Sequence, residues 1–134
     1  MSHTKCLSKI NGKSNLLIIF KSKSGNIFGG YSCQWLQKQN GYVQFDTLSS
    51  FLFSQTHNQF YSLKEANKAH AIYRPSSYNP SFGNGYDIYI GSDFTNGSSS
   101  LGTAYQIDKY DIQDHTTHLF GQSTPNLEEY EILK

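Results

Sequence analysis

The pattern of apolar and polar residues is most informative in residues 16–32. Five consecutive apolar residues, 16–20, predict a strand that is buried on both faces. Residues 21–26 then supply charged and small polar side chains together with a glycine, which is typical of a hairpin turn, and the chain returns through residues 27–31. We therefore predict a central β-hairpin around which the rest of the chain packs.

Two adjacent glycines interrupt the second strand of this hairpin. Gly29 and Gly30 carry no side chains, so a large ring or another backbone segment can approach the strand, or a bulge can form. Phe28 precedes the pair, and Tyr31 resumes the strand after it. We predict that Phe28, Gly29 and Gly30 form a notch in the core.

Short apolar segments predict further strands. The triplet Phe51, Leu52 and Phe53 predicts another core strand. Ser62 and Glu65 have the spacing of a capping box, and helix formers follow them. The apolar positions there do not keep a helical period, so we favour strand, turn and strand, with the second strand over 69–73.

Alternation returns in the last third of the chain. It predicts a strand over 86–90, with Asp87 and Tyr89 on one face, and a final strand over 126–134. Gly83 and Gly85 precede the first of these strands and allow a tight entry into it. They do not form a phosphate cradle, because a cradle needs a helix N-terminus after the glycines.

Composition narrows the class of protein. The chain has 134 residues, 15% of them aromatic, a net charge of +1 and two cysteines. The aromatic bias favours strands, and the scattered basic residues argue against nucleic-acid binding. Since the longest apolar run has five residues and no signal peptide begins the chain, we expect no direct membrane insertion, a cytoplasmic location and reduced thiols. The composition therefore indicates a β-rich chain.

Four segments in order resemble the TLDc domain of the oxidation-resistance proteins. They read NLLIIFKSKSGNIFGGYS, FLFS, PSFGNGYDIYI and EEYEIL. The matching residues include Phe28, Gly29, Gly30, Tyr31, Phe51, Leu52, Phe53, Phe82, Gly83, Gly85 and Asp87. We therefore expect residues 1–134 to be a single TLDc-like domain. The family domain begins with helical segments before the strand at 16–20, so the resemblance implies an N-terminally truncated member.

The resemblance implies an α+β fold that is mainly antiparallel β, a two-sheet β-sandwich with short flanking helices. It implies no enzymatic activity and no cofactor. It also implies a role in oxidative-stress protection, with a vacuolar-type proton ATPase as a protein partner. Within such a module, the acidic residues Glu128, Glu129 and Glu131 and the loop at Gly97 are the expected partner contacts, since rim charges steer association. In an extended strand, Glu129 and Glu131 share one face and Glu128 lies on the other.

Two other classes of function stay open. A thiol-dependent redox protein would use Cys33, activated by one of five histidines. A carbohydrate- or peptide-binding sandwich would use an aromatic platform. The candidates for that platform are Tyr73, Tyr78, Phe82, Tyr86 and Tyr89.

A metal site is the weakest candidate. His115 and His118 are three residues apart, with Asp111 and Asp114 nearby, and on a helix the two histidines would face the same way. Two adjacent threonines between them make a poor helix interior, and no further ligand pair completes a site. We therefore expect a solvated polar loop and no metal.

Overall fold

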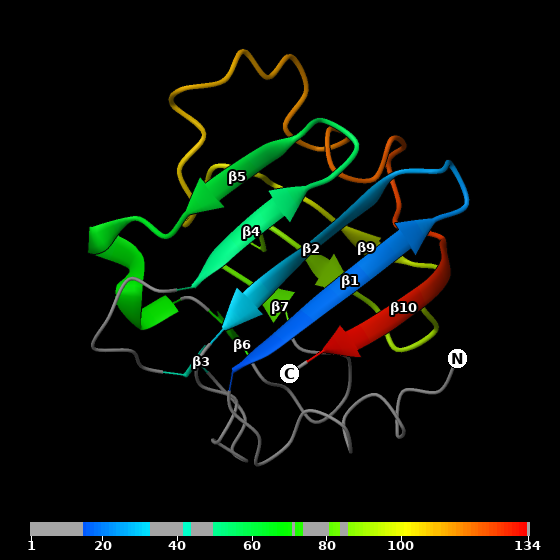
Figure 1. Ribbon diagram of the computed structural model, residues 1–134, viewed down its shortest axis with the longest axis horizontal. Helices are drawn as coiled ribbons and strands as arrows, with labels where there is room; N and C mark the ends of the chain where they lie inside the picture. Colours follow the sequence, from blue (N-terminus) through cyan, green and yellow to red (C-terminus); the bar gives the residue numbers. More distant parts are fainter. Residues whose placement is uncertain are drawn as a thin grey trace.

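A five-stranded antiparallel sheet dominates the structure (Figure 1). The computed structural model describes residues 15–32, 42–43, 50–70, 72–73, 81–83 and 86–133. The sheet has the order β10-β1-β2-β4-β5. Its strands are β1 (Leu16–Ser22), β2 (Ile27–Ser32), β4 (Phe51–Ser54), β5 (Gln59–Ser62) and β10 (Leu127–Leu133). The predicted hairpin is confirmed as β1 and β2, and the predicted last strand pairs with β1 on its other side.

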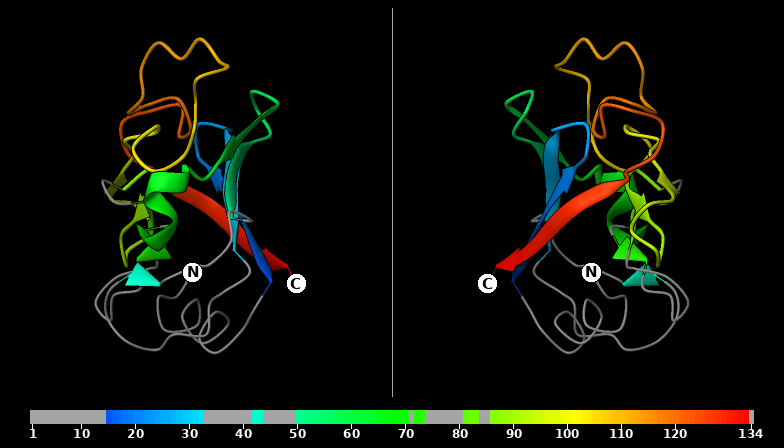
Figure 2. Two further views of the ribbon diagram at one scale, coloured as in Figure 1. Left: turned by 90° about the vertical axis from the view of Figure 1, so that its left-hand side faces the viewer. Right: turned by 90° about the vertical axis from the view of Figure 1, so that its right-hand side faces the viewer.

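Shorter strands form a second layer, which lies against one face of this sheet (Figure 2). A three-stranded sheet has the order β3-β6-β7, and β8 pairs with β9. A bridge between Phe82 and Ile88 links the end of β7 to the residue before β8. These strands are β3 (Tyr42–Val43), β6 (Ile72–Tyr73), β7 (Ser81–Phe82), β8 (Tyr89–Ile90) and β9 (Gly97–Ser98). The fold is therefore mainly antiparallel β, as predicted.

Helix is almost absent from the part of the chain that the structure describes, so the α part of the expected fold, with its short flanking helices, is not found there. Its single helical segment is the 3₁₀ helix η1 (Glu65–His70), which stands where the capping-box spacing had suggested a helix. The predicted strand over 69–73 is wrong at its start, because η1 runs through His70 and β6 begins at Ile72. Asn67 N donates to Lys64 O at 2.9 Å, a bond between residues three apart, which is the local pairing of a 3₁₀ helix. No helix in the described segments is long enough and apolar enough to cross a membrane.

The core fills the space between the two layers. The sheet contributes buried side chains that include Ile18, Phe28 and Leu52, and the second layer contributes Phe82 and Ile88. Phe28 stands at the centre of an aromatic series, with its ring centroid 5.5 Å from that of Phe20 and 5.2 Å from that of Phe120. Rings at these separations add to the stabilisation that apolar burial provides.

Strand β1 is buried on only one face, which corrects the prediction from its continuous apolar run. Its residues alternate between buried and half-buried along the strand. Leu16, Ile18 and Phe20 lie in the core, whereas Leu17 and Ile19 lie on the opposite, outer face. The pleat explains the difference, because successive side chains point to opposite faces and the second layer covers only one of them.

The triplet on β4 divides in the same way. Leu52 is fully buried, as predicted, but the half-buried Phe51 and Phe53 lie on the outer face and not in the core. The register confirms this, since Leu52 pairs with Gly30 and Tyr61, while Phe51 pairs with Tyr31. A dense apolar triplet therefore serves both faces of this sheet.

The predicted notch is confirmed, and a ring approaches each glycine. A Cβ atom at Gly30 would lie 2.7 Å from two atoms of the Phe82 ring and 2.9 Å from Leu52 Cδ2. At Gly29 it would meet the carbonyl oxygen of Ile18 and lie 2.9 Å from Phe53 Cε1. The pair thus admits Phe82 from the core side and Phe53 from the outer side.

Two further predictions concern the hairpin turn and the strand at 86–90. The first is confirmed, and the second is confirmed only in part. Gly25 has a φ of +95°, which confirms the expected turn chemistry. The strand predicted over 86–90 is shorter than expected, because β8 covers only Tyr89–Ile90 and Tyr86 has a φ of +59° in a turn.

Candidate functional site

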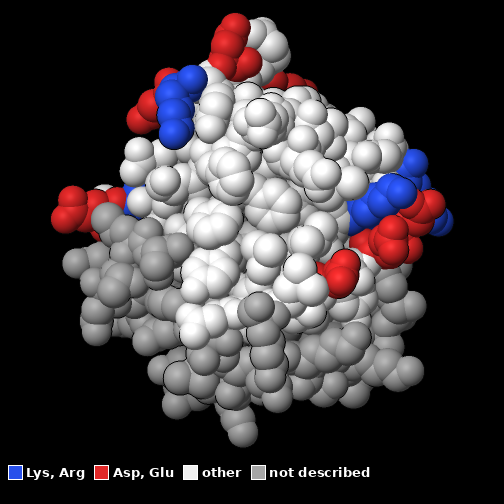
Figure 3. Space-filling model, viewed as in Figure 1, with Lys and Arg blue, Asp and Glu red and all other residues white. Residues whose placement is uncertain are grey.

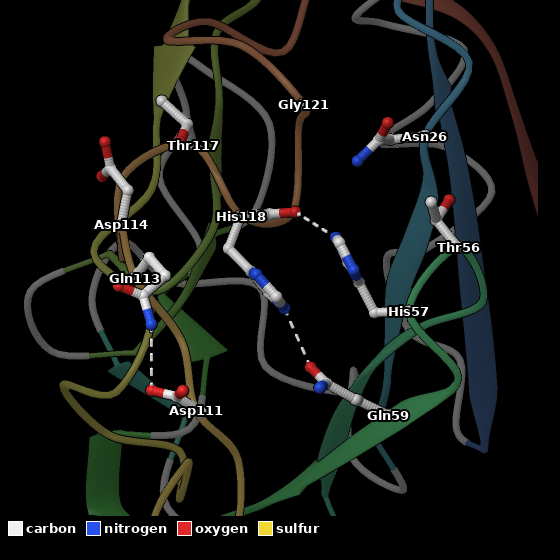
Figure 4. A pocket seen from close by; sticks show the side chains of 10 residues that line it. All are labelled: Asn26, Thr56, His57, Gln59, Asp111, Gln113, Asp114, Thr117, His118 and Gly121. Atoms are coloured by element: carbon white, nitrogen blue, oxygen red, sulfur yellow. Dashed lines mark hydrogen bonds between the residues drawn. The ribbon is translucent and has the colours of Figure 1, made fainter.

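A polar pocket lies between the β4–β5 turn and the segment 111–121 (Figure 4). Its volume is about 600 Å³. The lining side chains are amides, hydroxyls, carboxylates and imidazoles. They belong to Asn26, Thr56, His57, Gln59, Asp111, Gln113, Asp114, Thr117 and His118, and Gly121 completes the wall.

Two histidines stack at the centre of this pocket. The ring centroids of His57 and His118 are 3.9 Å apart, with 14° between the planes. His57 Nε2 lies 3.0 Å from the carbonyl oxygen of His118. His118 Nε2 lies 2.8 Å from Gln59 Oε1, which also accepts a hydrogen bond from the Tyr61 hydroxyl at 2.7 Å. These contacts tie the β4–β5 hairpin to the 111–121 segment.

The pKa of His118 makes it a poor proton carrier near neutral pH. Partial burial, with the neighbouring rings of His57 and His115, lowers this pKa from 6.5 to about 4. A general base works best when its pKa is close to the working pH. At pH 7 His118 is therefore neutral, and its role is a structural contact between the two segments.

The histidine and aspartate pairs do not gather into a metal cluster. Asp114 instead accepts hydrogen bonds from the Thr116 hydroxyl at 2.6 Å and from the Thr116 N–H at 2.9 Å, and these bonds lower the pKa of Asp114. Asp111 accepts from Gln113 Nε2 at 3.0 Å. Within the described ranges, no group of three or more His, Cys, Asp or Glu side chains is placed to hold a metal ion.

Asp87 is a buried carboxylate that organises residues 102–105. It accepts backbone hydrogen bonds from Gly102, Thr103 and Ala104 at 2.9–3.0 Å, and from Tyr105 at 3.3 Å. Burial raises the pKa of Asp87 from 3.8 to about 6, although these N–H groups act in the opposite direction. Position 83 needs a glycine, because the Cβ of any other residue would clash with the Asp87 carboxylate. Asp87 therefore holds a loop in place.

The three acidic residues of β10 lie at an edge of the sheet. The register with β1 shifts between Lys21 and Ser22, which pair with Glu129 and Leu127, so Glu128 occupies an irregularity in the strand. Its carboxylate reaches Lys21 Nζ at 3.3 Å. Lys21 lies on the outer face of the sheet, and the Glu128 side chain reaches it there. The expectation that Glu128 lies on the face opposite to Glu129 and Glu131 holds for an ideal strand and not at this irregularity.

Gly97 has a structural reason to be glycine. It lies in β9, where a Cβ would meet the carbonyl oxygen of Tyr89 and lie 2.9 Å from Pro125 Cγ. Its role as a partner contact stays a prediction.

The outer apolar face is the second candidate site, and sequence reasoning missed it. We define it as the outward apolar side chains of the five-stranded sheet. They are Leu17, Ile19, Ile27, Tyr31, Phe51, Phe53, Phe60 and Leu133. Figure 3 shows this face as uncharged across its centre, with charged side chains at its margins.

Aromatic rings cover the half of this face near β4 and β5. Tyr31 and Phe51 stack with centroids 5.4 Å apart, and Phe51 meets Phe60 edge-on at 5.8 Å. Phe60 is 57% exposed and Leu133 is 40% exposed. Contiguous exposed apolar surface of this kind marks interaction sites in many proteins.

Other sequence candidates have mixed outcomes. Phe82 is 1% exposed, so it belongs to the core and not to an aromatic platform. Tyr86 and Tyr89 are half-buried, with ring centroids 5.4 Å apart. Cys33, Tyr78 and Gly85 lie outside the described residues, as does the side chain of Tyr73.

Together these features define an antiparallel β domain with three characteristic parts. They are a hairpin with a notch at two glycines, a buried aspartate that holds residues 102–105, and a sheet face with exposed aromatic side chains. A family model for the TLDc domain matches residues 1–134. The chain belongs to the TLDc domain family, which confirms the resemblance seen in its sequence. A comparison with curated protein sequences gave no match.

Proposed function

We propose that this TLDc domain is a non-catalytic, cytoplasmic protein-interaction module that contributes to oxidative-stress protection by binding a vacuolar-type proton ATPase. Membership of the family supports this role. The observation that carries it is the outer apolar face, whose Phe60 ring is more than half exposed. Aromatic side chains on a rigid sheet provide large contact area at little conformational cost, which suits a binding surface.

We further infer that the complete fold is a two-sheet sandwich. The bridge between Phe82 and Ile88 supports this arrangement, since it joins the sheet containing β7 to the β8–β9 pair on the same side of the core. The second layer then acts as a continuous support for the five-stranded sheet. A sheet supported on one side keeps its other side rigid and available for a partner.

Purified vacuolar-type ATPase provides the test. The immobilised 134-residue chain should bind it saturably, and the captured enzyme should show changed ATP hydrolysis. Its matched control is the Gly30→Val variant, whose core we expect to fail. Absence of binding by a chain with a cooperative thermal transition would overturn the ATPase assignment. Cells expressing the chain should also survive peroxide better than cells expressing Gly30→Val.

A further inference from the structure

A groove lies beside the outer apolar face, next to β10 with its acidic side chains. Its volume is about 260 Å³, and it is lined by Ile19, Lys21, Ile27, Gln55, Glu129, Tyr130 and Glu131. Ile19 and Ile27 supply its apolar wall from β1 and β2, and the two glutamates stand on β10. An apolar wall beside carboxylates is complementary to a long basic side chain, whose stem is apolar and whose end is cationic.

The charges at this groove are not balanced within the described part of the chain. Lys21 pairs with Glu128 at 3.3 Å, and that is the single salt bridge among the described residues. Glu129 and Glu131 are exposed and take no part in it. Lys21 also lines the groove, but its ammonium pairs with Glu128, so Glu129 and Glu131 have no ion-pair partner among the described residues.

We propose that the outer apolar face docks a basic amphipathic helix of a partner protein, with an Arg or Lys side chain of that helix entering the groove beside Glu129 and Glu131. The helix would cover the rings of Tyr31, Phe51 and Phe60 with its apolar stripe. This inference rests on the proposed interaction function and adds the chemistry of the partner. It does not depend on the identity of the ATPase.

Backbone pairing favours a helix as the occupant. The centre of the face lies over β1, β2 and β4, each of which is already hydrogen-bonded on both sides. A strand can be added only at an open edge, whereas a helix satisfies its own backbone and can lie across paired strands. Strands β5 and β10 are separated by four strand spacings, roughly 19 Å. A helix of about 20 residues is about 30 Å long, so one helix lying across the strands can reach both the rings and the groove.

Synthetic peptides test the proposal directly. The probe is a fluorescent helical peptide of about 20 residues, long enough to span a small domain, with leucines on one stripe and arginines along one flank. Its matched control has glutamate in place of every arginine. The basic peptide should bind the full chain saturably and more weakly as salt increases, and the acidic peptide should not bind.

Variants of the chain locate the site. Glu129→Lys with Glu131→Lys should weaken binding of the basic peptide about tenfold, and Phe60→Ser should weaken it by a similar factor. Glu65→Lys is the control, because Glu65 is an exposed glutamate on η1, which follows β5 at the opposite side of the sheet from β10. It should leave the affinity unchanged, and all variants should keep the wild-type melting temperature.

Three outcomes would overturn the proposal. The first is an affinity that neither the glutamate reversals nor Phe60→Ser changes. The second is equal binding of the basic and acidic peptides. The third is a dimer of the chain that Phe60→Ser dissolves, which would make a second copy the occupant.

The ATPase experiment separates this inference from the proposed function. If the ATPase binds the chain and the basic peptide does not, the helix-docking inference fails and the interaction function stands. If the basic peptide binds as expected and the ATPase does not, the docking face stands and the ATPase assignment fails.

Discussion

Both faces of the five-stranded sheet carry apolar side chains, but the surroundings of these side chains differ. On the core face, Leu52 is fully buried and the Phe82 ring fills the space above Gly30. On the outer face, Phe53 covers Gly29, and Phe60 remains 57% exposed. The difference is the second layer, which lies on one side only. Apolar residues on both faces therefore indicate a core only where another element covers them, and elsewhere they indicate a binding surface.

The largest effect is expected from filling the core side of the notch. Gly30→Val should abolish cooperative folding, because its Cβ alone would lie 2.7 Å from the Phe82 ring and two methyl groups would follow. Circular dichroism melting checks this. Tyr31→Val places the same side chain at the next position, on the outer face, and should retain a cooperative transition.

A second substitution shows whether the Phe82 ring is the cause. Phe82→Leu removes ring atoms from the space that the introduced valine side chain would enter, so it should restore part of the stability lost in Gly30→Val. A Gly30→Val protein that melts at the wild-type temperature would contradict the notch.

Removing one apolar side chain from each face sharpens the comparison. Leu52→Ala should lower the free energy of unfolding by about 2–5 kcal/mol, since it leaves a cavity in a packed core. Phe60→Ala should change it by less than about 0.5 kcal/mol, because the ring is largely exposed. Urea denaturation measures both values. Equal losses would show that the outer face is packed as tightly as the core.

A buried carboxylate and an exposed one extend the contrast. Asp87→Asn should lower the free energy of unfolding at pH 7.5 by about 1–3 kcal/mol, because the amide NH₂ group faces backbone donors that the carboxylate accepted. Asp93→Asn is the control, since Asp93 is an exposed turn residue that accepts from Thr95 and Asn96. Its effect should be clearly smaller, and an Asp87→Asn chain as stable as wild type would contradict the loop-holding role.

The pH dependence of Asp87 has a definite sign. Burial raises its pKa from 3.8 to about 6, so between these values the folded chain holds more protons than the unfolded chain. Asp87 therefore contributes stability at low pH that is lost as the pH rises toward 6. As the pH rises from 3.8 to about 6, the difference in free energy of unfolding between wild type and Asp87→Asn should therefore decrease. A difference that stays constant over this range would contradict the raised pKa.

Local features of the fold were predictable from the sequence, because nearby residues determine them. The β1–β2 hairpin follows from an apolar run, a polar turn and Gly25, and the notch follows from two glycines within a strand. The side of the sheet that would be covered was not predictable in this way. Continuous apolar runs gave equal support to burial on both faces, and only the second layer distinguishes them.

Contacts between distant residues account for most of the candidate site that sequence reasoning missed. His57 and His118 are 61 positions apart, and the chain between them shows no pattern that brings them together. Asp87 was expected as a motif residue, but its bonds to residues 15–18 positions later depend on how the second layer folds back. The acidic strand was identified correctly, whereas its irregularity at Glu128 depends on pairing with β1.

The smallest effect is expected from His118, which stacks on His57 in the β4–β5 turn. The pKa of His118 is about 4 in the folded chain and about 6.5 when unfolded, so the unfolded chain takes up the proton first as the pH falls. The stability that neutral His118 contributes is therefore present above pH 6.5 and is lost toward pH 4. The change should stay below about 1 kcal/mol, since partial exposure screens the charges.

His118→Gln isolates this contribution from the opposite trend of Asp87. The difference in free energy of unfolding between wild type and His118→Gln should decrease from pH 7.5 to pH 4.5, as urea denaturation at each pH would measure. His115→Gln is the comparison, because His115 is exposed and forms neither the ring stack nor the bond to Gln59. His115 acts on the pKa of His118 only as the third of three causes, so the effect of its replacement should have the same direction and be smaller. If the difference for His118→Gln is the same at both pH values, His118 titrates alike in both states, and burial beside His57 does not hold it neutral.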